Sequence, residues 1–268
     1  MSELAAFFQS VKLPVMSEVG HALIQTLQDE DVSTSTVSNI LSKDPALTAK
    51  LLRLANSARF GQSRGVSSID DAISLVGMSQ VRTLGLAACM SESFPMVPGL
   101  DRLEFWKNSM ACAGYAKWLA SHLGVDGQQA WLAGMMVRLG ELLIGQSEPA
   151  KLVEIEQQPH LPGGRWEREQ NLLGLSEGQI TAELARRWNF PKEIVLALDS
   201  SSDPLSAHPF SRLAAVVHLA GLLAESPGDD PELLDSLPQD VVVTLQMNVE
   251  FMRSRVPRQD SFVDVTAL

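Results

Sequence analysis

Histidine binds catalytic metal ions and transfers protons near neutral pH more readily than any other side chain. This chain has five histidines, at His21, His122, His160, His208 and His218. No pair of them has the HxxxH or HxxE spacing that places two ligands on one face of a helix. We therefore expect surface or capping histidines, and a hydrogen-bonded core histidine at His218 in the apolar run "AAVVHLAG". The histidines predict no metal site.

Phosphate and thiol chemistry have little support either. The glycine pair in "LPGGRWE" lacks the preceding strand and the spacing of a phosphate-binding loop. The two cysteines, Cys89 and Cys112, lie in apolar contexts without CxxC spacing, which is typical of small core residues in a reducing compartment. We expect no catalytic residue, no metal and no cofactor.

One charged residue lies in an unusual position. Arg138 interrupts "AWLAGMMVRLGELLIG" at 130–145, which is apolar almost all the way round a helix. On a helical wheel it shares a narrow polar strip with Gly134 and Glu141. An exposed Arg138–Glu141 pair three residues apart is one interpretation, and it would stabilise the helix by only a few tenths of a kcal/mol.

Length, composition and charge limit the class of protein. The chain has 268 residues, of which 45% are hydrophobic, and a formal net charge of −11. No apolar run reaches the roughly 18 uncharged residues that a membrane span needs, and the first twenty residues lack the pattern of a signal peptide. The negative charge disfavours nucleic acid and anionic lipid surfaces as partners. We expect a cytoplasmic globular protein.

Apolar residues three or four positions apart in most long segments predict an all-α fold. Asp44 and Pro45 are typical of a helix start, Ser68 with Asp71 resembles a capping box, and Gly77 is a helix end. The run "VVVTL" at 241–245 is the one β-like segment, and we predict a helix there as well. At Asn56 and Ser57 the helix that follows Pro45 must bend or end, and we expect Asn56 to bond the backbone of the adjoining loop.

Taken in order, several phrases resemble the HDOD family, the HD-related output domains of bacterial signalling proteins. They begin at Leu13-Pro14 and continue as "DPALTAKLLRLANSARFG", "SSIDDAISLVG", "FWKNSMACAGYAKWLA", "AWLAGMMVRLGELLIG", "ELARRWNFPKEI" and "LAAVVHLAGLLA". The resemblance implies a compact multi-helix domain related to HD phosphohydrolases, usually without catalysis. It also singles out Asp44, Pro45, Asn56 and Ser57 as family-motif residues.

The resemblance implies that the HD metal site has been lost. Its first histidine falls near Asn108, its adjacent His-Asp pair at Val137 and Arg138, and its late aspartate at Gly221. Valine and glycine offer no ligating side chain, asparagine is a poor substitute, and arginine brings a positive charge to the place of a dication. Two other positions that often carry histidine are Glu177 and the serines near Ser201 and Ser202. The second interpretation of Arg138 is therefore a buried cleft ion pair with Glu177, or contact with an anion.

These observations predict one HDOD-type domain over 1–268. It would have an N-terminal helical half (about 1–98), a C-terminal HD-like half (about 99–225) and a helical C-terminal extension (about 226–268). The leading hypothesis is a non-catalytic signalling output or scaffold module that binds other signalling proteins. The alternatives are a sensor for an anionic metabolite or cyclic nucleotide in the former HD cleft, and, less favoured, a divergent metal-dependent phosphohydrolase. A homodimer remains open.

Overall fold

The computed structural model describes residues 3–29, 31–56, 66–95, 97–157, 161–226 and 231–262. The predicted all-α class is confirmed: within these ranges the chain forms helices and contains no strand. Among the described residues before 98, six α-helices form: α1 (Glu3–Ser10), α2 (Glu18–Thr26), α3 (Thr34–Leu41), α4 (Pro45–Ala55), α5 (Ile69–Val76) and α6 (Met78–Ser93).

The described helices after residue 98 fall in the ranges predicted for the C-terminal half, called the second half below, and for the extension. The second half contains α7 (Arg102–Leu123), α8 (Gly127–Met136), α9 (Leu139–Ser147), α10 (Pro149–Glu156), α11 (Gly164–Leu173), α12 (Glu177–Arg187), α13 (Lys192–Asp199) and α14 (Arg212–Glu225). The extension contains η2 (Pro231–Ser236), α15 (Gln239–Thr244), α16 (Val249–Arg253) and η3 (Gln259–Phe262). The β-like run is thus helical, as predicted. None of the described helices is long and apolar enough to cross a membrane.

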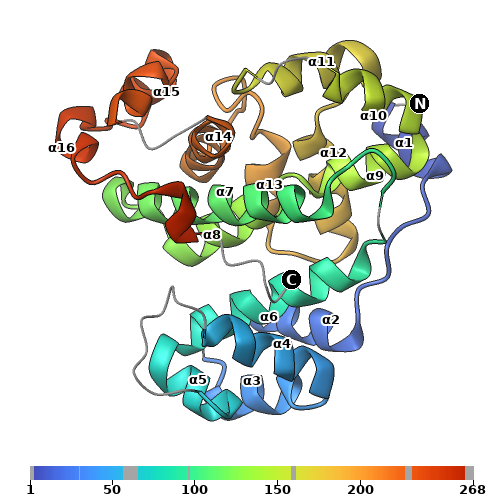
Figure 1. The fold of residues 1–268 in the computed structure, drawn as a ribbon, viewed down its shortest axis with the longest axis vertical. Coiled ribbons are helices and arrows are strands. Elements are labelled where there is room, and N and C mark those ends of the chain that lie inside the picture. Colours follow the sequence, from blue (N-terminus) through green and yellow to red (C-terminus); the bar gives the residue numbers. More distant parts are fainter. Residues whose placement is uncertain are drawn as a thin grey trace.

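Two lobes are visible in Figure 1, with α2 to α6 in one and α7 to α14 in the other. The first helix departs from the division expected near residue 98, because α1 lies with the second lobe and an extended segment connects it to α2. Phe7 and Phe8 of α1 are buried, and the Arg187 guanidinium of α12 lies 4.5 Å from the centroid of the Phe8 ring. The predicted boundaries otherwise remain a prediction.

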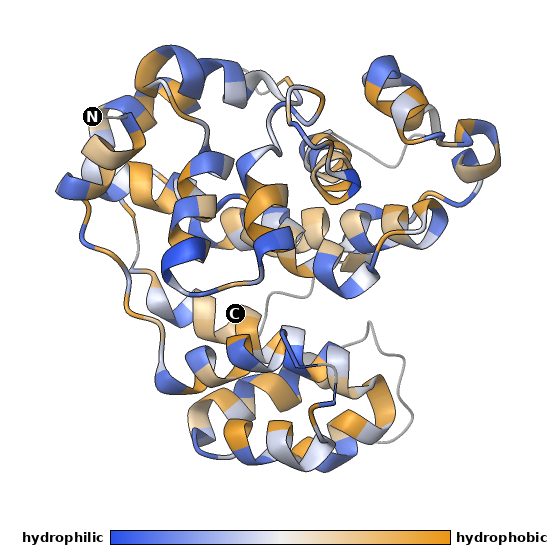
Figure 2. Cartoon of the chain, turned by 180° about the vertical axis from the view of Figure 1, so that it is seen from behind, coloured by the Kyte–Doolittle hydropathy of each residue, from blue (hydrophilic) through white to orange (hydrophobic). Residues whose placement is uncertain are grey.

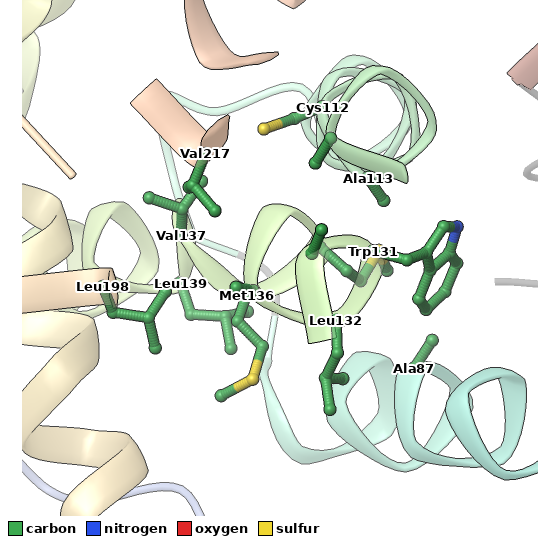
Figure 3. Packing of buried hydrophobic residues seen from close by; sticks show 14 of the residues in the cluster. Ala87, Cys112, Ala113, Trp131, Leu132, Met136, Val137, Leu139, Leu198 and Val217 are labelled. Atoms are coloured by element: carbon green, nitrogen blue, oxygen red, sulfur yellow. The ribbon is translucent and has the colours of Figure 1, made fainter. Parts of the chain in front are cut away.

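The core of the second lobe forms around α7, α8 and α14. Side chains at this junction are fully or almost fully buried, among them Trp131 and Val137 near α8 and Val217 of α14 (Figure 3). Most other helices are amphipathic and carry both hydrophobic and hydrophilic residues around their circumference (Figure 2). Cys89 and Cys112 are free and buried, as expected, and burial raises the pKa of the Cys112 thiol to about 12.

The helix starts and the helix end predicted in the first lobe are present in the structure. Asp44 Oδ1 accepts hydrogen bonds from the N–H groups of Ala46 (2.9 Å) and Leu47 (3.0 Å), and Pro45 is the first residue of α4. Ser68 Oγ accepts from Asp71 N–H, and Gly77 ends α5 with φ 89°.

Asn56 connects the end of α4 to the approach of α5. Its Nδ2 donates to the carbonyls of Leu52 and Val66, both at 2.8 Å, and its Oδ1 accepts from Val66 N–H at 2.6 Å. These are bonds to backbone groups of the adjoining loop, as expected, although Asn56 itself is exposed. Ser57 lies outside the described residues.

Candidate functional site

The positions expected to have lost metal ligands come together at one place in the second lobe. Val137 and Arg138 lie between α8 and α9, and Gly221 lies on α14. These three residues line a residual cavity of about 10 Å³ together with Glu177, the first residue of α12. Asn108 of α7 lines a second, outer cavity that also includes Arg138.

Trp166 of α11 fills the space beside Gly221. A Cβ atom at Gly221 would lie only 3.3 Å from Cζ2 of the Trp166 indole. The same indole stacks on His218, with ring centroids 4.8 Å apart, and its Nε1 donates to Glu177 Oε1 at 3.2 Å. A side chain at position 221 would therefore require the Trp166 ring to shift by a few tenths of an ångström. The sequence did not reveal that Trp166 lies at this site.

His218 is a buried core histidine, as predicted. Its Nδ1 lies 2.8 Å from the backbone carbonyl oxygen of Ser201, and only 8% of the residue is exposed. Burial lowers the pKa of His218, so the neutral ring is favoured, with Nδ1 as the donor to that carbonyl.

Arg138 is paired with Glu141. Its Nε and Nη2 donate to Glu141 Oε2 at 3.0 and 2.8 Å. The first interpretation named this partner but expected an exposed pair, whereas the two side chains are only 13% and 1% exposed. Burial lowers the pKa of Arg138, but Glu141 and Glu177 together raise it above its ordinary value, so the guanidinium stays charged.

The expected Arg138–Glu177 bond does not form, because other donors hold Glu177. Arg165 Nε donates to Glu177 Oε2 at 3.2 Å, and Trp166 holds the other carboxylate oxygen. Both donors come from α11, which covers the former cleft. The sequence offered only the i,i+4 spacing of Arg165 and Glu169 as a signal, and that spacing is equally common on solvated helices.

Arg165 is the centre of a buried charge cluster, which we define as Arg165, Glu141, Glu156, Glu169 and Glu177. Its Nε lies 3.0 Å from Glu169 Oε1, its Nη1 lies 3.5 Å from Glu141 Oε1, and Nη1 also bonds Glu156. Arg165, Glu169 and Glu177 are each at most 2% exposed. The cluster joins α9, α10, α11 and α12.

The carboxylates of this cluster outnumber the guanidiniums near them. Burial raises the pKa of Glu177 to about 7, against the opposing effect of Arg165 and Arg138. Burial and the adjacent Glu177 charge also raise the pKa of Glu169 well above its usual range. Like charges this close resist simultaneous ionisation, so protons are retained on buried carboxyl groups up to neutral pH.

The outer cavity has a volume of about 330 Å³ and opens beside this cluster. Two arginines and five carboxylates line it, together with Asn108: Arg138, Arg165, Asp101, Glu104, Glu141, Glu156 and Glu225.

The residues at the former HD site do not fit a divalent metal. Val137 and Gly221 have no donor atom, and the Arg138 cation lies between them and Asn108. Among the residues that the structure describes, no three His, Cys, Asp or Glu side chains are grouped so that they could hold a metal ion. No hydrolytic step through a metal can be built from these side chains.

Comparison with known proteins identifies the family. The HDOD domain model matches residues 13–204. The chain belongs to the HDOD family. A relative from Treponema pallidum (strain Nichols) is 27% identical over 176 residues, which is 64% of this chain and 34% of that protein, so this HDOD chain spans about a third of the curated relative's length.

Two solved structures are similar to this chain. A candidate phosphohydrolase from Shewanella amazonensis SB2B is 32% identical, with a TM-score of 0.72 over 93% of this HDOD chain and 88% of that chain. A candidate signal transduction protein from Marinobacter aquaeolei VT8 shares the fold at 24% identity, with a TM-score of 0.80 over 97% of this chain and 63% of that chain.

Proposed function

We propose that this HDOD chain is a non-catalytic output or scaffold module of bacterial signal transduction that acts by binding other signalling proteins. Membership of the HDOD family supports a signalling-associated role. The observation that carries the non-catalytic part is the Trp166 indole, which packs against Gly221 where the resemblance places a metal-binding aspartate.

A phosphohydrolase function, which the name of the Shewanella relative suggests, has weaker support in this chain. Hydrolysis by an HD site requires a metal to lower the pKa of a bound water and to neutralise the phosphate under attack. Here Arg138 stands where the resemblance places a metal-binding aspartate, and its charge is balanced by Glu141. Neither a nucleophile nor an open coordination position results from this arrangement.

A groove between the two lobes is the surface that we assign to a protein partner. Its volume is about 1060 Å³, and it is lined by residues from the α2–α3 loop, α6, α8, α12 and α13. Apolar side chains line it together with three acidic residues, Asp29, Asp126 and Glu193, and three basic ones, Arg82, Arg186 and Lys192. Balanced charge around an apolar lining suits a protein segment better than a polyanion such as nucleic acid. Leu196 of α13, which is 53% exposed, offers an apolar contact there.

The proposal that the protein is non-catalytic is tested on untagged purified protein in two ways. The metal content is measured, and hydrolysis of bis-p-nitrophenyl phosphate is assayed with added Mn²⁺ or Mg²⁺. We expect less than 0.1 equivalent of transition metal, which is roughly a background level, and no hydrolysis above that of buffer. One equivalent of tightly bound metal, or hydrolysis that Arg138→Ala changes, would contradict the proposal.

The partner-binding part is tested by affinity capture from the native cell extract. The bait is wild-type protein, Leu196→Asp or Val243→Asp, the last as a matched control because Val243 of α15 is also exposed (71%) and does not line the groove. We expect a signalling protein that wild type and Val243→Asp retain and that Leu196→Asp loses. Equal retention by all three baits would argue against the groove as the binding surface.

A further inference from the structure

We propose that α11 is a lid over the site of Arg138 and Gly221, which stays closed while the buried charge cluster retains a proton and opens when that proton is lost. The lid is independent of the scaffold function, because it concerns a movement within the second lobe and not a partner. The helix spans Gly164–Leu173 and places Trp166 against Gly221.

Each end of α11 carries a glycine that can act as a hinge. Gly163 precedes the helix with φ 76°, and Gly174 follows it with φ 69°. Both lie in the left-handed region, where glycine changes conformation without the strain that a side chain would bring. Lids commonly move about a few residues at the ends of the moving element, and small residues often fill that role.

Bonds to carboxylates hold α11 closed. Arg165 Nε and Trp166 Nε1 donate to the two oxygens of Glu177 on α12, both at 3.2 Å. In the opposite direction, the Glu177 N–H donates to Glu169 Oε2 at 2.7 Å. Arg165 and Glu169 are the fully buried residues of the helix, and its apolar contacts with the core come from partly buried side chains. The position of α11 therefore depends on the ionisation of these groups.

The charges around Arg165 do not balance. Its guanidinium faces four carboxylates, and Arg138 is a second guanidinium in contact with one of them. Four carboxylates against two guanidiniums leave an excess of two negative charges when every group is ionised. Such an excess is costly where water is largely excluded. A proton on a buried carboxyl group reduces it, so the closed lid binds that proton more strongly than the open lid.

Among the described residues around Glu177, the remaining groups do not supply the missing positive charge. Glu225 adds a further negative charge. Burial lowers the pKa of His218, which stacks on Trp166, and burial raises the pKa of the Cys112 thiol to about 12, so both groups are neutral near pH 7. The charged and titratable groups in this region are Cys112 on α7, Arg138 and Glu141 at the start of α9, Glu156 on α10, Arg165 and Glu169 on α11, and His218 and Glu225 on α14.

Loss of the proton opens the lid as pH rises. In the closed protein the pKa of Glu177 is about 7, mainly because the group is buried, whereas an exposed glutamate has a pKa near 4.5. The contribution of this group to closure is therefore complete below about pH 4.5 and is lost as pH rises through 7. The equilibrium constant for opening should rise at least about tenfold between about pH 5.5 and pH 7.5.

The test is hydrogen–deuterium exchange of the full chain, followed by mass spectrometry at about pH 5.5 and 7.5 and corrected for intrinsic exchange rates. We expect protection of the α11 amides to fall at least about tenfold across this range. At the higher pH it should lie at least about tenfold below that of the α7 amides, which report global unfolding. Sub-denaturing urea should leave exchange in α11 unchanged, because a lid exposes little surface when it opens.

Variants assign the pH dependence to the charge cluster. Glu177→Gln and Glu169→Gln each keep an acceptor oxygen and remove one titrating group, and we expect each to reduce the pH dependence of α11 protection at least about threefold. Two variants are used so that one remains informative if the other does not fold, as judged by circular dichroism. Glu154→Gln is the matched control, because Glu154 of α10 is exposed, and it should keep the wild-type dependence.

Three results would overturn the proposal. They are equal protection of the α11 and α7 amides at the higher pH, α11 protection that does not change with pH after correction, and a wild-type pH dependence in every folded glutamine variant of the cluster.

Discussion

Arg138 and Glu141 make an ion pair whose energetics follow from burial. The same i,i+3 pair on a helix surface would contribute a few tenths of a kcal/mol, because water screens both charges. Here the Glu141 side chain is 1% exposed, and a second guanidinium, that of Arg165, lies 3.5 Å from its other oxygen. The two glutamate oxygens thus each face a guanidinium inside the second lobe.

Arg138→Ala should therefore be strongly destabilising. It leaves a buried carboxylate with only the more distant Arg165, and we expect a loss of about 3–5 kcal/mol in the free energy of unfolding. Urea denaturation measures this loss. Arg186→Ala is the control, because the Arg186 side chain is 53% exposed in its pair with Glu183, and it should change stability by less than about 0.5 kcal/mol. Equal midpoints for the two variants would contradict the buried role of Arg138.

Glu177 makes stability depend on pH. Its pKa in the folded protein is about 7, above the unfolded value near 4.5, so its contribution is full below about pH 4.5 and is lost as pH rises through 7. Glu177→Gln keeps an acceptor for Trp166 and has no proton to lose. Between pH 5.5 and 8, the free energy of unfolding should therefore fall by about 1–3 kcal/mol less in the variant than in wild type.

The measurement for Glu177 is the free energy of unfolding in urea at several pH values. Glu154→Gln, at an exposed position of α10, should keep the wild-type slope. A Glu177→Gln slope that parallels wild type would show that this carboxyl group is ionised throughout the range.

At the scale of elements, α11 covers the site chiefly with polar side chains, and only Trp166, Leu172 and Leu173 of its residues pack against the hydrophobic core. Its fully buried residues are Arg165 and Glu169, and Trp166 is half-buried against α14. The helix is therefore held by the charge cluster together with the partly buried side chains of Trp166, Leu172 and Leu173. Sequence periodicity identifies helices by their apolar stripes, so it could not predict that this polar helix lies over the site.

The contact between α11 and α14 predicts coupling of two substitutions. Gly221→Asp alone should destabilise the protein by about 1–3 kcal/mol, because the new side chain meets the Trp166 ring. In a Trp166→Ala background that space is free, so the same change should cost at least about 1 kcal/mol less. A double-mutant cycle in urea measures the coupling. Additive effects of the two substitutions would place Trp166 away from Gly221.

Asn56 fastens α4 to the segment that precedes α5. Asn56→Ala removes three hydrogen bonds to backbone groups of Leu52 and Val66, and because the site is exposed we expect a net loss of about 1 kcal/mol. The melting temperature should fall by about 2–4 °C. Asn171→Ala, at an exposed position of α11, is the control. A variant that melts at the same temperature as wild type would contradict the structural role assigned to Asn56.

Over the whole molecule, the sequence predicted what local chemistry determines. The all-α class, the cap at Asp44 and the core position of His218 follow from residue type and spacing, and the structure contains all three. The family resemblance identified the positions that meet at the site. The partner of Glu177 and the lobe to which α1 belongs depend on contacts between segments far apart in the chain, which periodicity does not encode.

The position of α1 leads to a prediction about the whole fold. An isolated helix of eight residues is marginal in water and would contribute little to stability. Here α1 lies on the second lobe while the chain returns to the first at α2, so its anchoring also restrains the two lobes. Phe8 is 7% exposed and lies beneath Arg187. Phe8→Ala should therefore lower the free energy of unfolding by about 3–5 kcal/mol, as for a core phenylalanine.

Equilibrium unfolding in urea, followed by tryptophan fluorescence, tests the anchoring of α1. All five tryptophans lie between residues 106 and 188, within the second lobe, so the signal reports the lobe on which α1 packs. Phe251→Ala is the matched control, because Phe251 of α16 is 50% exposed under the Arg255 guanidinium and should contribute less than about 1 kcal/mol. If Phe8→Ala unfolded at the same urea concentration as Phe251→Ala, α1 would contribute no more to the fold than an exposed residue does, and its anchoring would not restrain the lobes.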